Sequence, residues 1–382
     1  MLPAKKTVRP SLADVLPSCL ASIFGQENSL GLPAVDRAVV VLVDGLGVSS
    51  LRARLGHART MAKVLTKAST ARAGFPSTTA ASLATLTTGE LPGIHGLVGY
   101  SVLDSANDRV VNQLSGWDDR LDPATWQRSS TVFEHAATLG VPSAVVAQEK
   151  YRDSGFTQAV LRGAAYQSGK TISDRFDVAR ATLESMTRGI VYLYVPELDQ
   201  AAHALGWESG KWTEELESVD SELARFSRSL GPREGMLVTA DHGILDVPAH
   251  SQVLFGDDPG LVDGIRFVAG EPRCLQLHCE PDASPELRAS ILERWKTAES
   301  GRSLVLSRDE AVANGWFGPT VAPEVIPRIG DILVAAQRNI AYYDTRAESQ
   351  SGRLMIGQHG SVSPEETIVP MLRFGAFDVT TR

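Results

Sequence analysis

Four short apolar runs constrain the fold of this 382-residue chain more than any other feature. Each run is continuous rather than alternating: AVVVLV (38–43), SAVVA (143–147), GIVYLYV (189–195) and MLVTA (236–240). Segments with helical periodicity, such as residues 174–188 and 212–230, lie between them. Continuous apolar strands separated by helices are typical of a parallel sheet that is covered on both faces. The pattern therefore predicts an α/β fold with a mainly parallel central sheet sandwiched between helices.

The local residue composition of the sequence changes near residue 254. Glycine, proline and aspartate crowd the stretch LFGDDPGLVDG, and a strand, a helix and a strand are then expected in RCLQLHC, SPELRASILERWKTAE and IGDILVAAQ. We interpret residues 254–350 as a small inserted α+β cap that shapes access to the rest of the protein. Residues 1–253 and 351–382 are assigned to the core.

Charge and composition exclude several classes of partner. The formal net charge of −8 argues against nucleic acid as a stable partner and against a membrane surface, since both need a basic face. No segment reaches the roughly 18 to 20 apolar residues of a membrane span, and Asp14 and Pro17 interrupt any apolar signal core. The three cysteines are too few and too unevenly spaced for a disulfide framework. These features predict a cytoplasmic protein.

Acidic and imidazole side chains follow three of the predicted strands. In a parallel sheet, residues just past the carboxyl ends of the strands converge on one site. A further histidine lies between glycines in GQHGS, so that the candidate set is Asp44, Asp199, His203, Asp241, His242 and His359. Mixed nitrogen and oxygen ligands suit zinc, with manganese or iron less favoured. Six ligands exceed the need of one tetrahedral ion and fit two divalent metal ions, an arrangement used in phosphoryl transfer.

Each of these residues also has a simpler interpretation when taken alone. Asp44 fits an Asp-Gly turn, and Asp199 with His203 fits an ordinary i, i+4 contact on a helix. Asp241-His242 fits a helix cap, and His359 fits a turn. The simpler interpretation has to hold four times at strand ends or glycine turns, which favours the joint interpretation as a metal site.

The stretch GFPSTTAASLATLTTG (74–89) predicts a helix that begins near Ser77 to Thr79 and ends at Gly89. A helix N-terminus suits a phosphate, and a hydroxyl beside a two-metal site can act as a nucleophile without a histidine base. His95, a little further along the chain, is expected to brace this loop rather than to bind metal.

Five motifs then occur in a characteristic order: VDGLG, FPSTTAASLATLTTGELPGIHG, PELDQAAH, TADHG and GQHGS. Together they resemble the type I phosphodiesterase/nucleotide pyrophosphatase family of the alkaline phosphatase superfamily, over roughly residues 38 to 360. The resemblance implies an alkaline phosphatase-like catalytic core and a small-molecule phosphate ester as substrate. The implied activity is metal-dependent hydrolysis of phosphodiesters or nucleotide pyrophosphate-like esters.

The resemblance also implies roles for individual residues. Thr79 falls on the position of the nucleophile, which forms a phosphothreonine intermediate that a metal-bound water hydrolyses. One ion would be held by Asp44, Thr79, Asp241 and His242, and the other by Asp199, His203 and His359. Both ions are expected to be Zn²⁺, with Mn²⁺ as the alternative.

The chain departs from the family pattern directly after the nucleophile. Members that cleave nucleotides carry F-P-N-H there, whereas this chain has Ala80-Ala81-Ser82-Leu83. Ala80 removes an aromatic that holds a nucleobase, and Ser82 replaces an asparagine as a shorter donor toward the phosphate, direct or through water. The alternatives are a phosphomonoesterase or phosphonate hydrolase of the same superfamily and, less favoured, a non-catalytic metal-bound scaffold. The P-loop-like stretch GAAYQSGKT (163–171) fails the required glycine spacing and is expected to be a surface turn.

Overall fold

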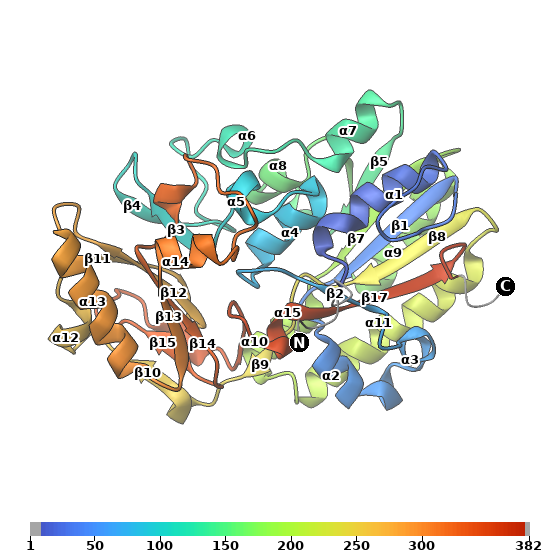
Figure 1. Cartoon of the computed structure of the whole chain (residues 1–382). Helices are drawn as coiled ribbons and strands as arrows, with labels where there is room; N and C mark the ends of the chain where they lie inside the picture. Colours follow the sequence, from blue (N-terminus) through green and yellow to red (C-terminus); the bar gives the residue numbers. More distant parts are fainter. Residues whose placement is uncertain (1–8, 379–382) are drawn as a thin grey trace, which may run out of the picture.

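The computed structural model describes residues 9–378 (Figure 1). A seven-stranded sheet forms its centre, in the order β2-β17-β8-β1-β7-β5-β6. The strands are β1 (Arg37–Val43), β2 (Thr70–Arg72), β5 (Ser143–Ala147), β6 (Ala165–Ser168), β7 (Gly189–Val195), β8 (Glu234–Thr239) and β17 (Ile368–Gly375). β1, β5, β6, β7 and β8 are parallel, whereas β17 runs antiparallel to its two neighbours, β8 and the edge strand β2. The predicted mainly parallel sheet is confirmed.

The buried strands explain why the sheet needs helices on both faces. All residues of β1 after Arg37 are buried, and the runs in β5 and β8 are buried throughout. One face is covered by α1 (Val15–Ile23), α4 (Thr79–Thr88), α7 (Val132–Thr138) and α8 (Gly155–Val160). The other is covered by α3 (Arg59–Val64), α9 (Ile172–Glu184) and α11 (Gly210–Ser229). The remaining helices of the core are α2 (Val48–Ala53), α5 (Pro92–His95), α6 (Pro123–Trp126), α10 (Glu197–Leu205) and α15 (Pro364–Thr367).

A second sheet, of six antiparallel strands, lies at the opposite end of the molecule in Figure 1. Its order is β13-β14-β12-β11-β3-β4. The strands are β3 (Ser101–Asp104), β4 (Arg109–Asn112), β11 (Ile265–Glu271), β12 (Cys274–Cys279), β13 (Ser303–Ser307) and β14 (Ile332–Ala336). Helices α12 (Pro259–Val262), α13 (Pro285–Ala298) and α14 (Arg308–Ala313) accompany it. We refer to this α+β unit as the cap.

The cap draws on two parts of the chain. The segment predicted as an insertion supplies four of its strands, and the hairpin β3-β4 joins β11 through the pair Gly270 and Ser101. The sequence assigns this hairpin to the core, and its strands, four residues long and partly buried, carry little signal of their own. The boundaries at residues 254 and 350 stay a prediction. Two small pairs connect the units, β9 (Leu245–Asp246) with β16 (Gly357–Gln358) and β10 (Gln252–Leu254) with β15 (Ala341–Tyr343).

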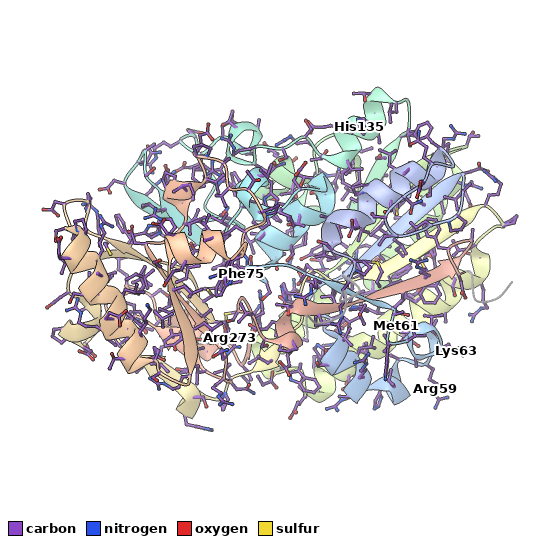
Figure 2. All side chains as sticks on the ribbon, in the orientation of Figure 1. Arg59, Met61, Lys63, Phe75, His135 and Arg273 are labelled. Carbon is purple, nitrogen blue, oxygen red and sulfur yellow. The ribbon has the colours of Figure 1, made fainter. Side chains whose placement is uncertain are left out.

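Two contacts fasten the cap to the core. The Phe75 ring packs edge-on against Trp316 and Phe317, at centroid distances of 4.5 and 5.4 Å. The fully buried Arg273 forms a two-pronged ion pair with the equally buried Glu366, at 2.7 and 3.1 Å. Figure 2 places Phe75 and Arg273 between the two sheets. The cap therefore anchors the loop that leads to the candidate nucleophile, Thr79.

Two further findings concern the helices and the cysteines. Between residues 9 and 378, no helix combines the length and the apolarity that crossing a membrane requires. Cys19, Cys274 and Cys279 are buried free thiols.

Candidate active site

The carboxyl edge of the central sheet brings the six predicted acidic and imidazole residues together. Asp44 follows β1, Asp199 lies in the first turn of α10 after β7, and Asp241 follows β8. They form two clusters, Asp44 with Asp241 and His242, and Asp199 with His203 and His359, and within each cluster the candidate ligand atoms lie within 4.8 Å of one another. His242 is followed by β9 rather than by a helix, so the capping interpretation of this pair does not apply.

In the first cluster, His242 Nε2 lies 3.4 Å from Asp44 Oδ1 and 3.5 Å from Asp241 Oδ2. The other oxygen of Asp241 accepts the backbone N–H groups of Gly45 and His242, at 3.2 and 3.0 Å. Asp44 Oδ1 and Asp241 Oδ2 are buried and have no hydrogen-bond partner between residues 9 and 378. Buried carboxylate oxygens without donors are costly, so this arrangement fits a bound cation.

The second cluster is built on a single turn of helix. Asp199 and His203 are four residues apart on α10, and His203 Nε2 lies 3.2 Å from Asp199 Oδ2. The ring of His359 stacks on that of His242 at a centroid distance of 3.5 Å and lies 5.3 Å from that of His203. Asp199 Oδ1 is again buried without a hydrogen-bond partner in the described part of the chain. The two clusters are therefore neighbours that meet at His359.

All three histidines are oriented by backbone carbonyls. The Nδ1 atoms of His203, His242 and His359 donate to the carbonyl oxygens of Gly357, Gly243 and Ser77, at 2.8, 3.2 and 2.9 Å. A donor at Nδ1 leaves the lone pair of Nε2 free, which is how metal-binding histidines are usually held. Each Nε2 is thereby prepared as a ligand.

The pKa shifts show how strongly the site is desolvated. Burial, together with the charges of Asp241 and Asp199, raises the pKa of Asp44 well above its usual range. Burial and the neighbouring His242 lower the pKa of His359 well below its usual range. Burial opposes the charged forms of Asp199 and His203, but their mutual attraction outweighs it, lowering the pKa of Asp199 and raising that of His203. A divalent cation would relieve the repulsion among the carboxylates.

The three neighbouring hydroxyls at the start of α4 have different surroundings. Ser77 Oγ donates to the carbonyl of Ser361 at 2.8 Å, and Thr78 is the N-cap residue, whose side chain accepts the N–H of Ala81 at 3.4 Å. Thr79 is the first helical residue, and its Oγ1 lies 3.1 Å from His242 Nε2. Of these three residues, only Thr79 places its hydroxyl next to a candidate metal ligand, His242 of the first cluster.

Two other sequence candidates are placed as follows. Ser82 is buried one turn after Thr79, its Oγ has no hydrogen-bond partner, and it does not line the cavities described below. His95 is fully buried, its Nε2 lies 3.0 Å from Thr85 Oγ1, and its Nδ1 accepts the N–H of Leu97. Burial lowers the pKa of His95 to about 3. The predicted bracing role of His95 is confirmed. Thr171, at the end of the P-loop-like stretch, caps α9 together with Asp174.

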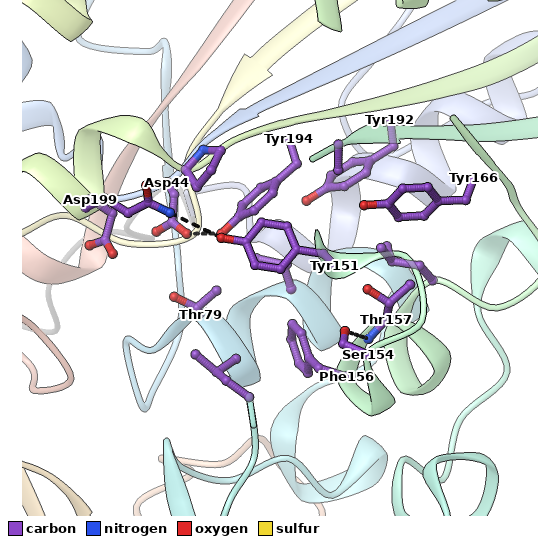
Figure 3. A pocket seen from close by; sticks show the side chains of 16 residues that line it. Asp44, Thr79, Tyr151, Ser154, Phe156, Thr157, Tyr166, Tyr192, Tyr194 and Asp199 are labelled. Carbon is purple, nitrogen blue, oxygen red and sulfur yellow. Dashed lines mark hydrogen bonds between the residues drawn. The ribbon is translucent and has the colours of Figure 1, made fainter. Parts of the chain in front are cut away.

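Two cavities open at Thr79. The first, which we call the tyrosine pocket, has a volume of about 200 Å³ and is walled by the rings of Tyr151, Tyr166, Tyr192, Tyr194 and Phe156 (Figure 3). The second, which we call the cap cavity, has a volume of about 520 Å³ and runs past His203 and His359 toward Glu271 of the cap. Thr79, Asp199 and Leu114 line both cavities.

Sequence reasoning missed the tyrosines. The hydroxyl of Tyr194 donates to Asp44 Oδ2 and so orients a candidate ligand. Tyr192 and Tyr194 are two residues apart on β7, and both therefore project from the same face of the strand that leads to Asp199. The spacing of Tyr192 and Tyr194 in the sequence was the signal that could have predicted a tyrosine-lined wall beside Asp199. Tyr151 ends a short 3₁₀ helix (Glu149–Tyr151) and Tyr166 lies on β6, and neither carries a comparable pattern.

Comparison with known proteins agrees with this geometry. A family model described as type I phosphodiesterase / nucleotide pyrophosphatase matches residues 38–362. The protein is accordingly a phosphoester hydrolase of a metal-dependent class. It belongs to the type I phosphodiesterase/nucleotide pyrophosphatase family. No curated protein matches the chain.

Solved structures show the same alkaline phosphatase-like fold. Human ectonucleotide pyrophosphatase/phosphodiesterase 5 is 15% identical, with 88% of this chain and 87% of that chain covered and a TM-score of 0.65. An inactive threonine-to-alanine form of the murine protein, in complex with AMP, is 14% identical. It is matched over 89% of this chain and 88% of that chain, with a TM-score of 0.66. Phosphonoacetate hydrolase from Sinorhizobium meliloti 1021, in complex with phosphonoformate, is 19% identical. It is matched over 90% of this chain and 91% of that chain, with a TM-score of 0.67.

Proposed function

We propose that the protein hydrolyses phosphodiesters or nucleotide pyrophosphate-like esters, with Thr79 as the nucleophile at a two-metal site. The observation that carries the proposal is the position of Thr79. Its hydroxyl lies 3.1 Å from His242 Nε2 of the first cluster, and it lines both cavities next to Asp199 of the second. The murine relative whose threonine-to-alanine form is described as inactive supports a threonine nucleophile.

The ligand set supports two divalent ions. Asp44, Thr79, Asp241 and His242 would hold one, and Asp199, His203 and His359 the other. The three unpartnered carboxylate oxygens and the three oriented Nε2 atoms fit such ions. Nitrogen and oxygen donors favour Zn²⁺, with Mn²⁺ as the alternative. When bound, the ions would neutralise charge on the phosphate and lower the pKa of the Thr79 hydroxyl.

The chain's own groups then have defined tasks. Thr79 Oγ1 attacks phosphorus, the bond to the leaving alcohol oxygen breaks, and the remaining ester stays on Thr79 as a phosphothreonine. Water then attacks the same phosphorus, which releases the monoester and restores the hydroxyl. The N-terminus of α4, which begins at Thr79, would favour the negative charge of a phosphate bound there. Ser82 lines neither cavity but is kept as a proposed phosphate contact, direct or through water, because its buried hydroxyl has no hydrogen-bond partner among the described residues. Tyr194 holds Asp44 in position.

The two cavities favour a diester over the alternatives. A diester has two organic groups on phosphorus, and two separate cavities meet at Thr79. The solved complex with phosphonoacetate keeps a phosphonate hydrolase as the second candidate. A carboxylated phosphonate calls for a cationic partner, and none of the described residues that line the two cavities is lysine or arginine. A scaffold without activity is disfavoured because all seven ligand and nucleophile positions are filled.

The test compares bis-p-nitrophenyl phosphate with p-nitrophenyl phosphate. We expect a higher kcat/KM for the diester, loss of activity with a chelator, and recovery on adding Zn²⁺ or, less fully, Mn²⁺. Absence of metal-dependent turnover of both esters would contradict an enzymatic role, and a clear preference for the monoester would favour the phosphomonoesterase alternative.

The proposal extends to the location of the protein. The three buried free thiols support a reducing, cytoplasmic location.

A further inference from the structure

The tyrosine pocket has an apolar wall and no positive charge. Its lining includes four tyrosines, Phe156, Leu83, Leu114 and Leu161, and its carboxylates, Asp44 and Asp199, belong to the two clusters. Two cations lie close by but do not line it. Lys150 Nζ is 4.8 Å from the centroid of the Tyr151 ring, and Arg152 Cζ is 4.8 Å from that of Tyr166 with its guanidinium bonded to Glu149. An anionic group inside the pocket would therefore meet no cationic side chain, and burying it would be costly.

The size of the pocket restricts its occupant further. An apolar cavity of about 150 Å³ accepts a benzene ring, whereas drug-sized ligands occupy roughly 300 to 1,000 Å³. At about 200 Å³ the tyrosine pocket matches one ring or a short alkyl chain. A whole nucleoside would have to extend out of it.

Apart from the carboxylates of the two clusters, Tyr192 is the pocket tyrosine whose hydroxyl has no partner among the described residues. Tyr166 donates to the carbonyl of Gln148, Tyr194 donates to Asp44, and the Tyr151 hydroxyl accepts from Gln200. Tyr192 is fully buried on β7, and its hydroxyl has no hydrogen-bond partner among the described residues. Figure 3 shows this hydroxyl directed toward the side of the pocket where Tyr194 lies. A buried hydroxyl without a partner is unfavourable unless a ligand supplies one.

We propose that the tyrosine pocket binds an uncharged, ring-sized organic group of the substrate, and that Tyr192 donates a hydrogen bond to an acceptor atom on it. This inference rests on the proposed function, because the group is one substituent of the phosphorus that Thr79 attacks. Tyr192 is then a specificity-determining residue, and the larger second substituent lies in the cap cavity.

Phosphonates that resemble the substrate test the pocket. The probes are methylphosphonate, phenylphosphonate, 4-carboxyphenylphosphonate and the three pyridylphosphonates, with dissociation constants measured by calorimetry on the zinc-loaded protein. We expect phenylphosphonate to bind at least about tenfold more tightly than methylphosphonate, because a buried ring gains that much or more. The carboxyphenyl compound should lose this gain.

The pyridyl series tests Tyr192. A pyridine ring matches phenyl in shape but carries one acceptor nitrogen, so one isomer should bind about two- to tenfold more tightly than phenylphosphonate. Tyr192→Phe should remove this preference and leave phenylphosphonate binding within about twofold. The variant loses only an unpartnered hydroxyl, and its thermal unfolding serves as the control for folding.

The possible results separate the two proposals. Equal binding of methyl- and phenylphosphonate, or undiminished binding of the carboxyphenyl compound, would overturn the assignment of the pocket. A pyridyl preference that survives in Tyr192→Phe, or is absent from the wild-type protein, would overturn the role of Tyr192. Because calorimetry needs no turnover, these results stand even if no ester is hydrolysed, an outcome that would refute the proposed function alone.

Discussion

At the scale of single residues, the site separates side chains that look alike in the sequence. Ser77 and Thr78 use their hydroxyls to fix the loop and to cap α4, whereas Thr79 directs its hydroxyl toward His242. Asp241 likewise uses one oxygen for backbone N–H groups and leaves the other without a partner. In a helix cap or turn all of these hydroxyls and carboxylate oxygens would be used for structure. Here the Thr79 hydroxyl and one Asp241 oxygen are left for chemistry.

The unpartnered oxygen of Asp241 leads to a prediction about metal retention. Asp241→Asn should lower the affinity for Zn²⁺ by about tenfold or more, because a neutral amide replaces a charged ligand. The metal content of the purified protein, measured by elemental analysis after dialysis, checks this. The matched control is Asp246→Asn, since burial already raises the pKa of Asp246 and it belongs to neither cluster. Full metal content in Asp241→Asn would remove this residue from the ligand set.

At the scale of elements, the loop before α4 is held by an aromatic contact with the cap. Phe75 is 8% exposed and packs against Trp316 and Phe317. Phe75→Ala should lower the free energy of unfolding by about 3 kcal/mol or more and should reduce kcat, because the loop leads directly to Thr79. Denaturant unfolding and steady-state kinetics measure the two effects.

The control for this change is Phe24→Ala, at a phenylalanine that is 37% exposed. Its loss should stay below about 1 kcal/mol. If both variants lost the same stability, the aromatic contact between loop and cap would not be an anchor.

At the scale of the whole molecule, one buried ion pair joins the cap to the core. Arg273 at the start of β12 and Glu366 in α15 are both fully buried, and Glu366 also accepts the N–H of Ser361. Glu366→Gln should destabilise the protein by about 3 to 5 kcal/mol, since it leaves the Arg273 charge buried without a counter-charge. Thermal and denaturant unfolding provide the measurement.

Glu184→Gln is the comparison for this ion pair. Glu184 is 65% exposed and pairs with Arg180 on the surface of α9, so its replacement should cost less than about 1 kcal/mol. A cost for Glu366→Gln as small as that of Glu184→Gln would show that the buried pair does not fasten the two units.

Much of this architecture could be predicted from the sequence, for physical reasons. The runs that became β1, β5, β7 and β8 are apolar throughout because both faces of these strands are buried. Asp44, Asp199 and Asp241 stand just past strand ends, which a parallel sheet must bring together. The hairpin β3-β4 was missed because its strands are short and only partly buried. The tyrosine pocket was missed because its tyrosines come from β6, β7 and a short 3₁₀ helix, which only the folded chain brings together.

The central claim is that Thr79 is the nucleophile, and the kcat/KM of Thr79→Ala for bis-p-nitrophenyl phosphate tests it most directly. Since Thr79 is also a proposed ligand, the variant is compared with the wild-type protein at equal zinc content, and Thr79→Ser, which keeps a hydroxyl, is the matched control. We predict a fall of more than about a thousandfold for Thr79→Ala and activity within about tenfold of wild type for Thr79→Ser. Activity of Thr79→Ala within tenfold of wild type would contradict the account.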